Sequence, residues 1–358
     1  MPASGSPVRD LHTFAEIFSQ AETWLASQRA LAADASFQKA VNAAAGRKEW
    51  LFVGCGTSFY LAEAASGAWT LLTGHRASAL PASELLLFPR LSQLKAADLQ
   101  VVVISRSGKT SEAVRAAELL TKNYKLPTLG ITCAKDSELA KVCQLTIAIP
   151  SADEQSMVMT RSFTSMLLAL IELAASQSNA GSFSSAIEAV AGALSTKIEL
   201  FNARIVGFVA KHTFADYIYL GQGPFFAIAR EAALKVTEMS CSYAQAYHTL
   251  EFRHGPKSIV APQTCLTFFL SESGMDDESE VLVEMKELGG TIIAICNRAS
   301  DAVRAASDLV FEIEADAPEL ALLAPFVAPA QLLGFHTGVK KGFNPDEPKN
   351  LSRVVILD

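Results

Sequence analysis

Short apolar runs alternate with helix-length segments along the chain. In the first half, the expected strands are residues 50–56, 99–105, 128–133 and 144–150, and the expected helices are 58–74 and 110–124. The strands are apolar at nearly every position instead of alternating with polar residues. Such continuous runs are typical of parallel strands that helices cover on both faces. The pattern therefore predicts an α/β fold.

The second half repeats this order of elements. Its expected strands, two of them with the turns that follow, are 216–224, 265–274, 291–297 and 309–314, with helices over 225–240 and 279–289. Gly54-x-Gly56 matches Gly221-x-Gly223 at an offset of 221 − 54 = 167, and the motif S-x-S-G at Ser105 recurs at Ser271, at 271 − 105 = 166. Cys133 and Cys296 follow at 296 − 133 = 163. Three landmarks at nearly one offset favour an internal duplication over two unrelated α/β halves.

The duplication predicts four parts of the chain. They are a helical N-terminal arm over 1–36, a first domain over 37–185, a second domain over 200–343 and a C-terminal tail over 344–358 that closes the active site. The join between the domains is expected in the polar, small-residue stretch Ser176–Ala186 and in the helix after it.

Composition narrows the class of protein. Apolar residues make up 50% of the 358 positions and charged residues only 19%. This is enough material for a large core, and it excludes disorder as the main state. The formal net charge is −7, whereas proteins that bind nucleic acids or anionic membranes are generally basic, so neither partner is expected. An anionic ligand would need a local site.

No segment predicts export or a membrane span. The N-terminus lacks a basic start followed by an apolar core and is not a signal peptide. The longest apolar stretch, Leu320–Phe335, contains two prolines and a glutamine and is expected to form a buried helix. The six cysteines form no C-x-x-C pair and are expected to be mostly buried, reduced thiols of a cytoplasmic protein.

The segment Ser105–Glu112 has the composition of an anion site. It follows a strand and opens a helix, and free N–H groups at a helix N-terminus favour an anion such as phosphate. Its hydroxyl and glycine positions are Ser105, Ser107, Gly108 and Thr110. Arg106 or Lys109 could add positive charge. The alternative is a serine-rich cap on an ordinary helix.

Two nucleotide motifs are excluded around these loops. The sequence GKT resembles the end of a Walker A loop, but Val103 stands where that motif needs its first glycine. Phe59 and Phe226 stand where the dinucleotide fingerprint needs its third glycine. A nucleotide cofactor is therefore disfavoured. Thr57 and Ser58 place two more hydroxyl groups at the carboxyl end of a strand, where ligands bind in open α/β sheets.

The helix expected over 225–240 carries a row of charged residues. Glu231, Lys235 and Glu238 are spaced i, i+4 and i+7, which places them on one helix face. A solvated salt-bridge ladder is the alternative interpretation. The other positions of the helix are largely apolar and it begins just after a glycine turn, so an acid–base role is favoured.

Two further segments carry candidate chemistry. His254 precedes Gly255-Pro256 in a loop, where an imidazole can act as an acid–base group near pH 7, although a lone loop histidine more often has no such role. Its spacing from His248 does not indicate a metal site. In the tail, Lys349 and Arg353 could offer positive charge to an anionic ligand, or the tail simply docks.

Together these motifs resemble the SIS, or sugar isomerase, family. The stretches GCGTS, SRSGKTSE and EQSMVMTRSFT are similar to its phosphosugar-binding loops, and GQGPFFAIAREAALKVTEMS resembles the second module of the isomerase half of glucosamine-6-phosphate synthase. FRHGPKS and the NPDEP tail are also similar to tagatose-6-phosphate ketose/aldose isomerases and galactosamine-6-phosphate deaminases. The resemblance covers nearly all of the chain after about residue 37. It implies two tandem flavodoxin-like modules, each a parallel sheet with helices on both faces.

The resemblance also implies roles for individual residues. Glu238 would move a proton between carbon 1 and carbon 2 of a sugar phosphate, supported by Lys235 and Glu231. His254 would assist ring opening from the neighbouring subunit of a homodimer with shared active sites. The residues implied to bind substrate and phosphate are Gly56, Thr57, Ser58, Ser105, Arg106, Ser107, Thr110, Glu154, Thr160 and Arg353. No metal or organic cofactor is implied.

The chain departs from the synthase pattern in two places. The synthase has an N-terminal glutaminase domain with a cysteine after the initiator methionine, whereas Pro2 follows Met1 here, so glutamine-derived ammonia is not expected. The tail lysine that the synthase uses toward the sugar carbonyl is replaced by Arg353, which stays protonated and forms no Schiff base. Lys349 is the nearest alternative for an imine.

The expected activity is that of a cytoplasmic aldose–ketose isomerase, with or without coupled deamination. It would act on a hexose 6-phosphate or hexosamine 6-phosphate through an enediol. Two alternatives stay open: a non-catalytic phosphosugar-binding regulator, and a deglycase of phosphorylated sugar–amino-acid adducts. Residues 1–36 are too short and too acidic to be the DNA-binding segment of a regulator. The sequence does not identify the sugar, or whether Lys349 or Arg353 contacts it.

Overall fold

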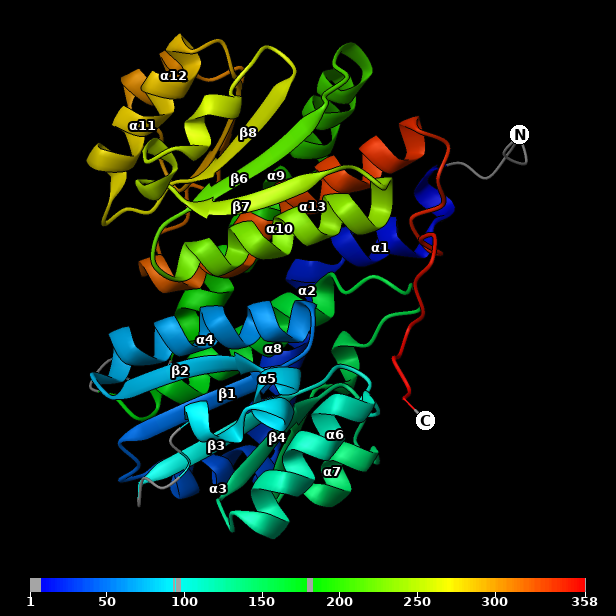
Figure 1. The fold of residues 1–358 in the computed structure, drawn as a ribbon, viewed down its shortest axis with the longest axis vertical. Coiled ribbons are helices and arrows are strands. Elements are labelled where there is room, and N and C mark those ends of the chain that lie inside the picture. Colours follow the sequence, from blue (N-terminus) through cyan, green and yellow to red (C-terminus); the bar gives the residue numbers. More distant parts are fainter. Residues whose placement is uncertain (1–7, 93, 95–97, 179–182, 358) are drawn as a thin grey trace. The chain divides into compact units, whose positions relative to one another are not determined.

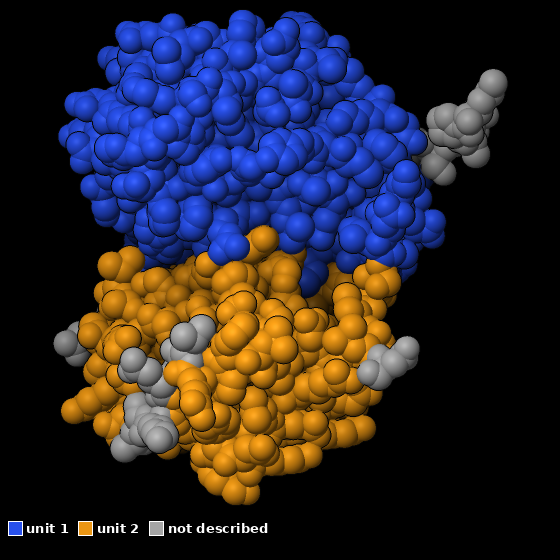
Figure 2. Space-filling view, viewed as in Figure 1, with its two compact units in different colours: residues 1–21, 155–160, 188–351 blue, residues 22–154, 161–187, 352–358 orange. Residues whose placement is uncertain are grey.

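The computed structural model describes residues 8–92, 94, 98–178 and 183–357. The chain divides into two compact units (Figure 2): unit 1 is residues 1–21, 155–160 and 188–351, and unit 2 is residues 22–154, 161–187 and 352–358. Each unit holds one five-stranded parallel sheet, and helices cover both faces of each sheet (Figure 1). The predicted α/β fold with two tandem parallel-sheet modules is confirmed.

The sheet of unit 2 has the strand order β2-β1-β3-β4-β5. Its strands are β1 (Glu49–Gly54), β2 (Arg76–Pro81), β3 (Leu99–Ile104), β4 (Thr128–Thr132) and β5 (Leu145–Ala148). The helical segments around it are α2 (Gln20–Ala33), α3 (Ala35–Ala44), α4 (Thr57–Thr73), α5 (Ala82–Leu87), η2 (Pro89–Ser92), α6 (Ser111–Glu118), η3 (Leu119–Asn123), α7 (Glu138–Val142), η4 (Pro150–Ala152) and α8 (Arg161–Ala175).

Side chains along β1 alternate between two cores. Trp50 faces α4, where its ring centroid lies 3.8 Å from that of Trp69. Leu51 and Val53 face the opposite side and pack in an apolar cluster that includes Ala116 of α6. Because both faces of the strand are covered, both sets of alternating positions must be apolar. This explains the continuous hydrophobic run in the sequence.

The sheet of unit 1 has the order β10-β9-β8-β6-β7. Its strands are β6 (Asp216–Gly221), β7 (Ala244–His248), β8 (Thr264–Phe269), β9 (Thr291–Cys296) and β10 (Leu309–Glu312). The helical segments of this part are η1 (Val8–Asp10), α1 (His12–Phe18), α9 (Ser184–Lys211), α10 (Pro224–Ser240), η5 (Glu251–Arg253), η6 (Pro256–Ile259), α11 (Met275–Glu287), α12 (Asp301–Ala306), η7 (Glu319–Leu322) and α13 (Leu323–Lys340).

The two units are copies of one plan. Read from one edge of each sheet to the other, the strand orders β2-β1-β3-β4-β5 and β7-β6-β8-β9-β10 correspond strand by strand. Gly56 and Gly223, at equivalent turns, have nearly the same backbone conformation, with φ 54° and ψ −127° against φ 55° and ψ −133°. Non-glycine residues rarely adopt this conformation. The internal duplication inferred from the sequence is confirmed.

Helix α10 packs against α13 at very short range. A Cβ atom added to Gly338 of α13 would lie 2.1 Å from the carbonyl oxygen of Met239, so a side chain there would force α10 away. The segment Glu319–Lys340 is the only part of the described chain that is long and apolar enough to cross a membrane, and its apolar stretch is wholly buried. The buried helix predicted for 320–335 is thus confirmed as α13.

One strand in each sheet was not predicted from the hydrophobic pattern of the sequence. These are β2 and β7, and both form the sheet edge next to the first strand of their module. Their side chains are exposed or half-buried, because an edge strand has a neighbour on one side only. Without a continuous apolar run, neither segment carried the signal used to find the buried strands.

The predicted arm and join are only partly described. Residues 8–36 form η1, α1, α2 and the start of α3, while residues 1–7, at the proposed start of the arm, and residues 179–182, in the proposed join, lie outside the described residues. The predicted arm is divided between the two units, because residues 1–21 belong to unit 1 and residues 22–36 belong to unit 2. The four domain limits stay a prediction.

Candidate active site

The fold brings the predicted phosphate-binding segments to one end of the unit 2 sheet. Strand order reverses between β1 and β3, since β2 lies on the far side of β1. In open α/β sheets, ligands bind at the carboxyl ends of the strands beside such a reversal. In unit 2 this place carries the turn 54–58, after β1, and the loop 105–110, after β3.

The turn after β1 leads directly into α4. Gly56 is the N-cap of this helix and has a positive φ of 54°, which glycine adopts without strain. Thr57 and Ser58 follow in the first helical turn, with only 6% and 5% of their surface exposed. The start of α4 therefore offers two nearly buried hydroxyl groups at an end of the helix that attracts anions.

The loop after β3 is built around its own hydroxyl groups. The Ser105 hydroxyl lies 3.4 Å from Thr110 Oγ1 and accepts the Gly108 N–H at 3.2 Å. The Ser107 oxygen accepts the Lys109 N–H at 3.2 Å. Gly108 has a φ of 61°, and a Cβ there would lie 2.1 Å from the Ser137 hydroxyl. The loop is thus a tight turn immediately before α6, with Thr110 as its N-cap.

Arg106 does not extend into solvent from this loop. Its Nη1 lies 3.0 Å from Glu154 Oε2, and the two side chains are 5% and 0% exposed. The Glu154 carboxylate also accepts the Ser162 N–H at 3.0 Å and the Ser162 hydroxyl at 2.5 Å. A buried ion pair with these additional hydrogen bonds holds both residues in place. Their predicted contact with phosphate stays a prediction.

The end of the tail lies along the same loop. Arg106 Nη2 donates to the carbonyl oxygen of Arg353 at 3.2 Å, and Arg353 Nη2 donates to Asp153 Oδ1 at 3.1 Å and to the carbonyl of Glu154. The Ser111 N–H, at the start of α6, donates to the carbonyl of Val355 at 3.2 Å. The guanidinium of Arg353 thus bonds to protein groups, and Lys349 is exposed.

Thr160 ends a short segment that the arm holds in place. It is fully buried, and the segment 155–160 belongs to unit 1. Glu16 Oε1 of α1 accepts the N–H groups of Gln155 and Ser156 at 2.6 and 3.3 Å. Glu16 was not predicted as a functional residue, because its partners lie far along the chain and no local pattern marks it. The role of Thr160 toward substrate stays a prediction.

Asp346 of the NPDEP tail is a second residue that sequence analysis missed. Its Oδ1 accepts the N–H and the hydroxyl of Thr13, both at 2.7 Å, and its Oδ2 accepts the His12 N–H at 2.9 Å. It caps α1 from the other end of the chain, as an acidic N-cap does. Met157 N–H donates to its carbonyl oxygen at 3.2 Å. The tail therefore also orders part of unit 1.

The charged row predicted on α10 is a buried triad. Lys235 Nζ lies 3.3 Å from Glu231 Oε1 and 2.5 Å from Glu238 Oε2. Lys235 and Glu231 are fully buried, whereas 17% of the Glu238 side chain is exposed. Burial alone would lower the pKa of Lys235, but the carboxylates of Glu231 and Glu238 raise it above its ordinary value. The solvated ladder is therefore excluded, and Glu238 is the member that a ligand can reach.

His254 lies on the surface of unit 1. It follows η5, and its backbone N–H donates to the Glu251 carbonyl at 3.0 Å. Within the described part of the chain, no hydrogen bond links its imidazole to Glu238, Lys235 or Glu231. The ring is free to meet a ligand or another chain, and its predicted role in ring opening stays a prediction.

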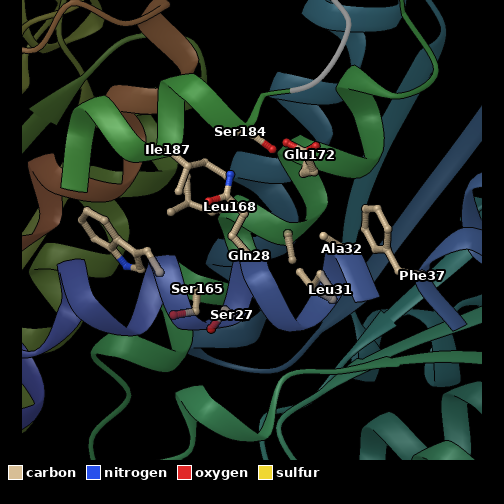
Figure 3. A pocket seen from close by; sticks show the side chains of 12 residues that line it. Ser27, Gln28, Leu31, Ala32, Phe37, Ser165, Leu168, Glu172, Ser184 and Ile187 are labelled. Carbon is tan, nitrogen blue, oxygen red and sulfur yellow. The ribbon is translucent and has the colours of Figure 1, made fainter. Parts of the chain in front are cut away.

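Each unit also holds a cavity. Figure 3 shows one of about 50 Å³ in unit 2, lined by side chains that include Gln28, Leu168 and Glu172. A cavity of about 450 Å³ in unit 1 is lined by residues that include Phe14 and His336. No predicted site residue lines either one. Among the described residues, no three His, Cys, Asp or Glu side chains gather as a metal site.

Known proteins resemble both the sequence and the fold. The family model described as SIS domain matches residues 45–176 and 216–336, which take in both sheets. The chain is 29% identical over 273 residues to a glutamine–fructose-6-phosphate aminotransferase (isomerizing) of Caulobacter vibrioides, covering 72% of this chain and 44% of the relative. The chain spans about half the length of the curated aminotransferases that it matches.

Two solved structures match over nearly the full length. Tagatose-6-phosphate ketose/aldose isomerase from Escherichia coli is 25% identical with a TM-score of 0.83, and the match covers 98% of each chain. Glucosamine-6-phosphate deaminase from Thermotoga maritima is 28% identical with a TM-score of 0.75, and the match covers 97% of this chain and 100% of the other. The similar proteins thus act on hexose or hexosamine phosphates.

Proposed function

Because the chain belongs to the SIS domain family, we propose that it is an aldose–ketose isomerase acting on a hexose 6-phosphate or hexosamine 6-phosphate. The buried triad on α10 is the observation that carries this proposal. A protonated lysine between two carboxylates keeps Glu238 in a fixed orientation while leaving part of it accessible. A carboxylate held in this way is suited to accept and return a proton.

The proposed reaction moves one proton and one carbonyl. Glu238 takes the proton from carbon 2 of the open-chain aldose, which leaves an enediolate with its negative charge on oxygen 1. The proton of the carbon 2 hydroxyl passes to oxygen 1, and Glu238 returns its proton to carbon 1 to give the ketose. The Lys235 ammonium stabilises the carboxylate form of Glu238, and Glu231 balances the charge of that lysine. His254 protonates the ring oxygen to open the sugar, from the neighbouring subunit of a homodimer.

The phosphate is assigned to the loops of unit 2. The hydroxyl groups of Thr57, Ser58, Ser105, Ser107 and Thr110 and the N-termini of α4 and α6 supply the donors. Binding the substrate by a group remote from the reacting carbons helps to orient it. Gly56, Thr160 and Arg353 complete the proposed site, and Arg106 and Glu154 form the buried ion pair beside the loop 105–110. The reaction involves no net oxidation and is proposed to need no cofactor, and we place it in the cytoplasm.

Release of ammonia is the second candidate outcome. The similarity to a structure named as a glucosamine-6-phosphate deaminase favours it. Isomerisation of a 2-amino sugar phosphate at carbon 2 yields an intermediate that water can hydrolyse with loss of ammonia. The same Glu238 proton transfer would start both reactions, so the two differ in substrate and product instead of in catalytic residues.

A panel of hexose and hexosamine 6-phosphates in heavy water tests the proposal. We expect one member to exchange its carbon 2 proton, seen by proton NMR, and Glu238→Gln to abolish the exchange without preventing binding. An ammonia assay on the same samples separates deamination from simple isomerisation. Binding without exchange would indicate a regulator, and release of an amino acid from a phosphorylated sugar adduct would indicate a deglycase.

A further inference from the structure

The central strands of the two sheets end in loops of the same form. The loop after β3 reads Ser105-Arg106-Ser107-Gly108, and the loop after β8 reads Ser271-Glu272-Ser273-Gly274. In each loop the glycine N–H donates to the hydroxyl of the first serine, at 3.2 Å in the first and 2.9 Å in the second. The two loops therefore share a hydrogen bond, and their second residues have opposite charges.

In unit 1 a carboxylate of the chain itself occupies the loop. Glu319 Oε1 accepts the Ser273 N–H at 3.0 Å, and Glu319 Oε2 accepts the Ser273 hydroxyl at 2.5 Å. These are the donors with which such a loop would hold two oxygens of a phosphate. Glu272 accepts a hydrogen bond from Asn297 Nδ2 at 2.7 Å and offers no positive charge to draw Glu319 away.

In unit 2 the corresponding carboxylate is held elsewhere. Glu154 precedes Glu319 by 319 − 154 = 165 residues, close to the offsets of the repeat. It is bound to Arg106 and Ser162 instead of to the loop serine. Within the described residues, the N–H and the hydroxyl proton of Ser107 have no acceptor. The donors that Glu319 fills in one module are thus open in the other.

We infer that Arg106 is a positioning residue, which keeps the loop 105–110 open to a phosphate group by holding Glu154 in a buried ion pair. The equivalent loop of unit 1 has Glu272 in place of this arginine and is closed by Glu319. A carboxylate that reached Ser107 would compete with phosphate for the same donors and repel it. Arg106 acts through Glu154, without touching the phosphate. This inference rests on the phosphate binding proposed above.

Calorimetric titration with inorganic phosphate tests the inference. Arg106→Gln frees Glu154, and we expect the affinity to fall about tenfold or more, as for a lost hydrogen bond to a charged group. Arg106→Gln with Glu154→Gln removes the competing carboxylate, and we expect the affinity to return to within about threefold of the unmodified protein. If Arg106 bound phosphate directly, the double variant would stay as weak as the single one, and the inference would be wrong.

Controls separate this inference from the proposed function and from unfolding. Arg106→Gln removes the buried cationic partner of Glu154 and is destabilising, so thermal unfolding is measured for each variant. If the single variant does not fold, the phosphate affinity of the double variant, which buries neither charge, tests the role of Arg106. Glu319→Gln is the matched control and should not change the affinity of the loop 105–110, because Glu319 contacts Ser273 in the other loop. Absence of phosphate and phosphosugar binding in the unmodified protein would contradict the proposed function, whereas binding that Arg106→Gln leaves intact would contradict only the role of Arg106.

Discussion

Helices α4 and α10 occupy equivalent places in the two modules and carry different chemistry. Both follow a Gly-x-Gly turn and run for 17 residues. The triad of α10 is Glu231, Lys235 and Glu238, and the residues 167 positions earlier, on α4, are Ala64, Ala68 and Leu71. One copy of the helix thus bears a largely buried row of charged side chains, and the other bears only apolar side chains at the same positions.

In the loops after β3 and β8, unit 2 instead of unit 1 has the groups available for a ligand. The loop of unit 2 leaves the donors of Ser107 open, whereas the loop of unit 1 binds its own Glu319. Under the function proposed above, each module therefore carries one of two capacities: anion binding in unit 2 and acid–base chemistry in unit 1. The duplicated fold thus supplies two equivalent places for a site, and a few charged residues decide what each can do.

The largest expected effect is the loss of proton transfer on α10. Glu238→Gln keeps the shape of the side chain but cannot accept the proton, so turnover should fall about 10²–10⁴-fold while phosphosugar affinity is retained. Leu71→Gln, at the equivalent exposed position of α4, is the control and should leave turnover unchanged. Turnover close to normal in Glu238→Gln would contradict the assignment of the base.

The second prediction concerns the buried charges of the triad. Lys235→Met leaves the fully buried Glu231 without its ammonium partner, and the free energy of unfolding should fall by about 3–5 kcal/mol. Adding Glu231→Gln removes that buried charge and should recover part of the loss. Urea unfolding of the two variants measures both. Equal stability of Lys235→Met and the unmodified protein would show that the lysine does not offset a buried charge.

Matched serine variants test the difference between the loops. Ser107→Ala should weaken phosphate binding by roughly 1.5–3 kcal/mol, the value of a hydrogen bond to a charged group. Ser273→Ala should leave it unchanged, since Glu319 already occupies that serine. Calorimetry with inorganic phosphate gives both affinities. A comparable loss in both variants would mean that the second loop also binds phosphate.

The second loop should also give the protein a pH-dependent stability. Burial, with smaller contributions from nearby Glu319 and Asp277, raises the pKa of Glu278 from 4.5 to about 7, and its carboxyl accepts the Ser271 hydroxyl. The pKa of Glu278 is therefore higher in the folded state than in the unfolded state, and protonation of its carboxyl stabilises the fold. This stabilisation is complete below pH 4.5 and is lost as the pH rises through about 7.

The size of this effect is bounded by the shift. Each pKa unit is worth about 1.4 kcal/mol, so the free energy of unfolding should decline by up to about 3 kcal/mol across that range. Glu278→Gln, which cannot ionise, should remove this decline in a series of urea titrations at different pH. An unchanged pH profile in the variant would place the titrating group elsewhere.

The smallest effect is expected in the tail. Arg353→Lys keeps the charge but not the forked contact with Asp153 and Glu154, so stability should change little and activity modestly. Borohydride added with substrate should trap no sugar on the tail peptide, since arginine forms no imine. Mass spectrometry of the treated protein checks this. An adduct on Lys349 would overturn catalysis by an enediol alone.

Much of this fold follows from local sequence patterns. The buried strands are continuous apolar runs because both of their faces are covered, as the positions of Trp50 and Leu51 show. The Gly-x-Gly turns and the S-x-S-G loops recur at nearly the same offset, which reveals the duplication. The spacing of Glu231, Lys235 and Glu238 places them on one helix face. Apart from the repeat, each of these patterns reflects neighbours within a few turns of the chain.

Only the tertiary structure decided which charges meet. Local sequence does not indicate that Arg106 pairs with Glu154, that Glu319 fills the loop at Ser273, or that Asp346 caps α1. The partly exposed edge strands β2 and β7 also lack the continuous hydrophobic run that predicts a buried strand. The pattern of hydrophobic positions along the chain indicates which positions are buried, because buried positions favour apolar side chains. The partner of a charged side chain depends on which distant segments the sheets bring together, and no local spacing encodes that.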